Sequence, residues 1–148
     1  MLVALQEAKA AYSAGEIPVG CVIVERANGQ IISKAHNMMQ QAKNANLHAE
    51  IIAINLACQK TQDKNLSNYD IYVTLEPCTM CASAISNARL GRLYYGADDP
   101  KQGAVENGVK FYTSKVCLHR PEIYSGLCGS ESKEMLKSFF YQLRKSKL

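Results

Sequence analysis

The stretch from residue 70 to residue 97 most constrains the fold, because its hydrophobic pattern changes twice. The segment DIYVTL (70–75) is rich in β-branched and aromatic residues and predicts a strand, as does RLYYGA (92–97). Between them, TMCASAISNAR (79–89) predicts a helix. A strand, a helix and a strand with short joints form a βαβ unit, which implies two parallel strands and a right-handed crossover. The chain is therefore expected to be an α/β protein.

The rest of the chain predicts further layers around this unit. VGCVIVE (19–25) and QIISKAH (30–36) predict a hairpin of two strands around the turn ANG. Helices are predicted over three other segments, residues 2–14, 47–60 and 131–145. The second of these is strongly apolar and is expected to lie buried between layers. The fold class predicted is a three-layer α-β-α domain with helices on both faces of a mixed sheet.

Length and composition limit the classes of protein that remain. The chain has 148 residues, of which 47% are hydrophobic and 20% charged, which suits one globular domain over residues 1–148. No stretch approaches the ~18 apolar residues of a membrane span. The N-terminal segment lacks the basic and apolar regions of a signal peptide. We therefore expect a cytoplasmic protein, with its six cysteines reduced and no membrane partner.

Two cysteines open the helix of the βαβ unit, in the segment EPCTMC (76–81). Cys78 and Cys81 are three positions apart, so their side chains can converge on one point. A helix N-terminus also lowers the pKa of a thiol. This geometry suits half of a zinc site and a redox dithiol equally well, so the motif alone leaves both open.

The segment HAE (48–50) favours the metal site. His48 and Glu50 can serve one site if the start of the 47–60 helix points at it. His48 with Cys78 and Cys81 supplies one nitrogen and two sulfur ligands, and a fourth position stays open. That arrangement is typical of a catalytic zinc rather than a structural one.

With these residues in place, the sequence resembles the zinc-dependent cytidine deaminase superfamily, whose signature is H-x-E followed by P-C-x-x-C. Longer stretches resemble its bacterial tRNA adenosine deaminase branch: GEIPVGCVIV (15–24), LHAEIIAI (47–54), YVTLEPCTMCASAI (72–85), GRLYYGADDPKQGA (91–104) and LKSFFYQLRKSK (136–147). The resemblance implies a cytidine deaminase-like sheet of about five strands. It also implies a homodimer that converts adenosine to inosine at the wobble position of a tRNA anticodon, with an arginine tRNA as the expected substrate.

The resemblance also assigns roles to single residues. His48, Cys78 and Cys81 would bind one Zn²⁺ per chain. Glu50 would be the catalytic proton shuttle, which takes a proton from the attacking water and delivers it to the ring nitrogen and the leaving ammonia. The backbone N–H groups of Ala49 and Cys78 could stabilise the developing charge.

Substrate contacts are expected from two sets of residues. The flipped base would meet Asn37, Ile17, Leu47 and Ala49, of which Asn37 also suits a turn at the end of a strand. Leu47 is larger than the alanine usual in the family and could reshape the pocket entrance. RNA contacts are expected from Asp99, Lys101, Arg144 and Lys145. The last two lie in a basic C-terminal helix of a chain with formal charge +4.

Three other functions fit part of the pattern. A deaminase of a free base or nucleoside (guanine, cytosine or cytidine) would share the same metal motif. A thioredoxin-like dithiol oxidoreductase would use Cys78 and Cys81 but leaves His48 and Glu50 unexplained. A catalytically silent RNA-binding protein with a structural zinc would have no use for the carboxylate of Glu50.

Overall fold

A computed structural model describes residues 1–148 and contains one mixed five-stranded sheet. The strand order is β2-β1-β3-β4-β5, with β1 antiparallel to β2 and β3, and with β3, β4 and β5 parallel. The strands are β1 (Gly20–Glu25), β2 (Ile31–His36), β3 (Tyr69–Leu75), β4 (Arg92–Ala97) and β5 (Glu122–Tyr124). The predicted hairpin and the parallel pair of the βαβ unit are both confirmed.

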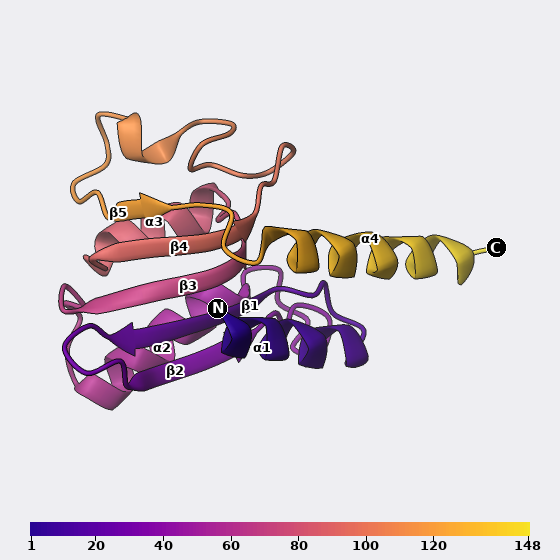
Figure 1. Ribbon diagram of the computed structural model, residues 1–148, viewed down its shortest axis with the longest axis horizontal. Helices are drawn as coiled ribbons and strands as arrows, with labels where there is room; N and C mark the ends of the chain where they lie inside the picture. Colours follow the sequence, from indigo (N-terminus) through magenta and orange to yellow (C-terminus); the bar gives the residue numbers. More distant parts are fainter.

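Helices cover both faces of the sheet. They are α1 (Leu2–Ser13), α2 (Ala49–Thr61), α3 (Thr79–Asn87) and α4 (Gly129–Lys145), with a short 3-10 helix η1 (Phe111–Thr113). Figure 1 shows α1 and α4 on the near face of the sheet and α2 and α3 behind it. The predicted three-layer α/β fold is therefore confirmed. None of these helices is both long and apolar enough to span a membrane.

The main core lies where α2 and α3 pack on the sheet. Its buried side chains come from alternating strand positions and from one side of each helix, and they include Cys21, Ile23, Ile71, Val73, Leu93, Tyr95, Ala53, Ala57 and Ile85. On the other face α1 approaches β1 very closely at Gly20. A Cβ built on Gly20 would collide with Ala4 O and lie 2.6 Å from Ala8 N. The chain therefore needs glycine there to close this layer.

Two helical faces are less buried than their apolar character predicts. In α2, Leu56 is 43% exposed, so the prediction of a helix buried between layers is wrong for its outer side. In α4, Phe139 is the only apolar residue that is buried, whereas Phe140 and Leu143 are exposed. The reason is that α4 runs beyond the sheet, and its outer turns have no strand beneath them (Figure 1).

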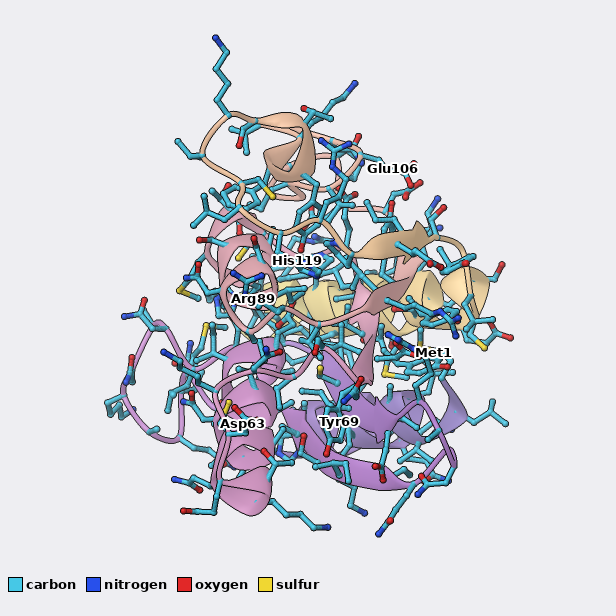
Figure 2. The ribbon with its side chains drawn as sticks, turned by 90° about the vertical axis from the view of Figure 1, so that its left-hand side faces the viewer. Met1, Asp63, Tyr69, Arg89, Glu106 and His119 are labelled. Atoms are coloured by element: carbon cyan, nitrogen blue, oxygen red, sulfur yellow. The ribbon has the colours of Figure 1, made fainter.

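The direction of the strands brings the helix starts to one edge of the sheet. Strands β2, β3, β4 and β5 run the same way, so α2, which follows β2, and α3, which follows β3, both begin at that edge. Figure 2 views the opposite edge, marked by Tyr69 at the start of β3 and by Asp63 and Arg89 just beyond the ends of α2 and α3. The predicted site residues at the helix starts therefore share the far edge.

Candidate metal centre and its surroundings

His48 and Cys78 occupy equivalent places, because each is the N-cap residue of its helix, α2 or α3. Cys81 lies in the first turn of α3. The Nδ1 atom of His48 is 3.6 Å from the Sγ of Cys78 and 3.6 Å from the Sγ of Cys81. The three ligand atoms all lie within 4.8 Å of one another. The three residues that the sequence predicts as metal ligands therefore do lie together.

These separations fit a tetrahedral zinc ion. With Zn–S near 2.3 Å and Zn–N near 2.05 Å, a tetrahedral angle places nitrogen and sulfur ligands about 3.6 Å apart. One imidazole nitrogen and two thiol sulfurs form a donor set that zinc prefers over magnesium or calcium. The group thus fits zinc in both geometry and chemistry, with three protein ligands.

Hydrogen bonding within the group shifts the pKa of each of the three side chains, and it favours the thiolate only at Cys78. A hydrogen bond from Cys81, helped by one from His48, lowers the pKa of Cys78 to about 4 despite its partial burial. The same pairing with Cys78, together with burial, raises the pKa of Cys81. The hydrogen bond with Cys78 also raises the pKa of His48. The lowered pKa favours the thiolate of Cys78, the form that binds metal.

Glu50 lies in the first turn of α2, one residue beyond the N-terminal residue Ala49. Its side chain is buried, with the residue only 4% exposed. Burial raises the pKa of Glu50 to about 7, even though the nearby His48 favours the charged form. A carboxyl group with that pKa can both accept and release a proton near neutral pH, as a general acid–base catalyst must.

Asn37 lies buried at the end of β2 and its side chain binds the start of α2. Its Oδ1 accepts a hydrogen bond of 2.8 Å from the backbone N–H of Ala49, and Ala49 is fully buried. The expectation that the Ala49 N–H could stabilise developing charge is therefore wrong, because the side chain of Asn37 already accepts a hydrogen bond from it. The Nδ2 of Asn37 makes no hydrogen bond with the protein. Of the other expected pocket residues, Ile17 and Leu47 are half-buried.

Two buried glutamates that sequence reasoning did not single out bind the backbones of the flanking loops. Glu16 is fully buried, and its Oε1 accepts hydrogen bonds from the N–H groups of Gln40 (2.7 Å) and Gln41 (2.8 Å). These residues lie in the loop between Asn37 and Leu47. Glu76, between β3 and Cys78, accepts hydrogen bonds from backbone N–H groups of the loop of residues 98–108, among them those of Asp99 and Val105. The only sequence signal was an acidic residue inside an otherwise apolar segment.

The 98–108 loop lines a cavity of about 360 Å³ beside the metal group, here called the Lys101 cavity. Its lining residues come from the start of α3, from this loop and from the residue after it: Cys78, Thr79, Met80, Lys101, Gln102, Gly103, Gly108 and Val109. Asp99 is not among the lining residues. Its Oδ1 accepts hydrogen bonds from the backbone N–H groups of Lys101 and Gln102, both 3.1 Å long. The expected RNA contact Lys101 is thus next to a ligand residue, whereas one oxygen of Asp99 shapes the turn.

The remaining expected RNA contacts lie in the last turn of α4. Arg144 and Lys145 are exposed, and the Nζ of Lys145 is 4.7 Å from the centre of the Tyr141 ring. Helix α4 starts after β5, at the edge of the sheet where Cys78 lies, and extends outward from that edge (Figure 1). The basic turn is therefore separate from the metal group, although α4 projects from the same edge of the sheet.

Fold and site together place the molecule among the deaminases. Residues 1–144 match the model of the MafB19-like deaminase family. A tRNA-specific adenosine deaminase of Rickettsia bellii (strain RML369-C) is 56% identical over 141 residues, which are 95% of this chain and 97% of that protein. The chain belongs to the tRNA-specific adenosine deaminase family. The predicted family and enzyme class are confirmed, and the dithiol oxidoreductase is set aside.

Solved structures agree with this assignment. One structure, from studies of A-to-I editing by tRNA:A34 deaminases at the wobble position of transfer RNA, matches with a TM-score of 0.89 at 49% identity, over 92% of this chain and 97% of that one. A guanine deaminase from Nitrosomonas europaea matches with a TM-score of 0.81 at 20% identity, over 93% and 80% of the two chains. At that identity the second likeness concerns the fold alone.

Proposed function

We propose that this protein deaminates adenosine to inosine at the wobble position of a tRNA anticodon. The observation that carries the proposal is the group of His48, Cys78 and Cys81 at tetrahedral zinc separations, with the buried Glu50 two positions after His48. High identity to tRNA-specific adenosine deaminases over almost the whole chain supports tRNA as the substrate rather than a free base.

In this proposal His48, Cys78 and Cys81 hold one Zn²⁺ per chain and Glu50 is the catalytic residue. The bound zinc acts as a Lewis acid that lowers the pKa of water toward ~7. Glu50, with a pKa raised by burial to about 7, accepts a proton from the attacking water and passes it to the purine ring nitrogen. It then carries a second proton to the leaving amino group, so that adenosine and water become inosine and ammonia.

The base would be flipped out of the anticodon loop to reach this buried site. Asn37 would donate its Nδ2 to the base while its Oδ1 stays on Ala49. The half-buried side chains of Ile17 and Leu47 would form walls of the pocket, together with the buried Ala49.

RNA binding is assigned to exposed basic residues at or beyond the edge of the sheet where the site lies. Lys101 lines the cavity beside Cys78, and Arg144 and Lys145 form the basic end of α4. All three can neutralise phosphates of the anticodon stem-loop. Asp99 would contact the RNA through its second carboxylate oxygen. An arginine tRNA, a homodimer, a single domain over residues 1–148 and a cytoplasmic location complete the proposal.

Incubation of the zinc-loaded protein with an arginine-tRNA anticodon stem-loop that carries a wobble adenosine tests the function. Inosine should appear at that position, and the Glu50→Ala variant should bind zinc and RNA but lose turnover. Guanine, cytosine and cytidine serve as parallel substrates. Deamination of one of these, with no inosine in the stem-loop, would overturn the proposal in favour of a free-base or nucleoside deaminase.

A further inference from the structure

Glu76 follows β3 directly and precedes the Pro77–Cys78 pair. It is only 2% exposed, and no lysine, arginine or histidine pairs with it in any ion pair of the structure. Its carboxylate accepts five hydrogen bonds instead, all from the 98–108 loop: from the backbone N–H groups of Asp99, Val105, Glu106 and Asn107 (3.0–3.1 Å) and from the side-chain Nδ2 of Asn107 (2.6 Å). Hydrogen bonds to an ionised acceptor are stronger than those between neutral groups.

The loop also closes directly onto the segment that carries the metal ligand. Gly103 pairs with Cys78 in an antiparallel bridge, and the N–H of Ala104 donates to the carbonyl of Pro77 at 2.9 Å. A Cβ on Gly103 would lie 2.5 Å from the Cδ of Glu76, so the backbone reaches this carboxylate only because residue 103 has no side chain. Glu76 therefore organises the interior of the loop.

Other residues of the same loop face the site. Lys101, Gln102 and Gly103 line the Lys101 cavity together with Cys78. Asp99, whose N–H is held by Glu76, in turn accepts hydrogen bonds from the N–H groups of Lys101 and Gln102. A continuous chain of hydrogen bonds thus runs from the buried Glu76 carboxylate to the backbone of the exposed Lys101.

We propose that Glu76 is a positioning residue that fixes the 98–108 loop as a wall of the Lys101 cavity and so sets where Lys101 meets the RNA backbone next to the target base. This inference rests on the proposed function, because it names a determinant of RNA binding at the same site. Glu76 makes no contact with the substrate itself. Its removal changes the position and mobility of the wall, not the chemistry at Glu50.

The test compares Glu76→Ala with Glu76→Gln in the full-length zinc-loaded protein, with the anticodon stem-loop as substrate. The alanine loses all five hydrogen bonds, whereas the glutamine keeps one acceptor oxygen. We expect Glu76→Ala to raise KM by about 10- to 100-fold, the cost of misplacing a binding group, with a smaller change in kcat. Glu76→Gln should fall between alanine and wild type. Zinc should remain at about one per chain.

Amide hydrogen exchange provides a second readout that needs no activity. In Glu76→Ala, residues 99–107 should exchange faster, while β1 and β3 keep their protection. The matched control is Glu25→Ala, which removes a carboxylate that bonds only Asn28 in the hairpin turn, and it should match wild type in both assays.

Each outcome decides the proposal. Unchanged KM or unchanged exchange of residues 99–107 in Glu76→Ala overturns it, and so does a fall in kcat that follows loss of zinc. If Glu76→Ala does not fold, wild-type KM and exchange in Glu76→Gln overturn it instead. If the wild-type protein makes no inosine, the proposed function fails on its own, and the exchange measurement still decides whether Glu76 fixes the loop.

Discussion

Replacing Asn37 by alanine should destabilise the protein as well as impair its activity. The side chain is buried, and its Oδ1 accepts a 2.8 Å hydrogen bond from the Ala49 N–H, which is itself fully buried. The alanine variant leaves that N–H without a partner, at the start of a helix where intrahelical acceptors are lacking. Leaving a buried donor unpaired costs about 1–3 kcal/mol, so the free energy of unfolding should fall by that amount.

Urea unfolding measures this effect. For a chain of this size the dependence on urea is about 1–3 kcal/mol per molar, so the midpoint should move down by about 1 M. Zinc must be held at one fixed concentration, because a ligand that binds only the folded state adds to its stability. Fluorescence of the eight tyrosines can follow the transition, since the chain has no tryptophan.

The matched control is Asn37→Asp, which keeps an acceptor oxygen in place of Oδ1 but loses the amide donor. It should recover more than half of the lost stability and still show a raised KM for the stem-loop. If Asn37→Ala unfolds at the wild-type midpoint, the hydrogen bond to Ala49 has no net energetic value. The reasoning that Asn37 builds the start of α2 would then be refuted, and a role confined to the base would remain.

Four further substitutions test three separate parts of the structure. Gly20→Ala forces a methyl group into the backbone of α1 at Ala4. It should lower the free energy of unfolding by about 1–3 kcal/mol, measured by thermal or urea unfolding. A variant as stable as wild type would contradict the close packing. Cys78→Ser should bring the zinc content, measured by elemental analysis, well below the wild-type value of about one per chain. Arg144→Ala and Lys145→Ala should each weaken stem-loop binding and reduce the slope of log K against log salt by about 0.7–0.9, and an unchanged slope would exclude a phosphate contact.

The parts of the fold that the sequence predicted are those with strong local patterns. The hairpin and the βαβ unit follow from runs of β-branched residues interrupted by a helical segment. Strand β5 was missed because it has only three residues, Glu122–Tyr124, too few to show an alternation of period two. It forms because β4 offers it a parallel edge, a tertiary condition that a local pattern cannot contain.

The metal group was predictable for a different reason. His48 and Cys78 each lie at the start of a helix, and a helix start is marked in sequence by the residues that precede an apolar run. Once β2 and β3 are known to run in the same direction, the helices that follow them must start at one edge of the sheet. Topology alone therefore brings together two residues that are thirty positions apart.

The surroundings of the metal group were not predictable, because they depend on buried side chains that bind distant backbone. Asn37, Glu16 and Glu76 each accept hydrogen bonds from main-chain N–H groups, and neither the donors nor the loop shapes have a signature in sequence. A buried carboxylate is costly unless such partners surround it. Two of these residues, Glu16 and Glu76, are acids within apolar segments, and a charged residue that is buried with such a segment needs a structural explanation. The irregular loops of 37–48 and 98–108 take a defined shape around these acceptors. Buried side chains therefore determine the shape of the walls of the site, whereas the direction of the strands determines where the metal ligands lie.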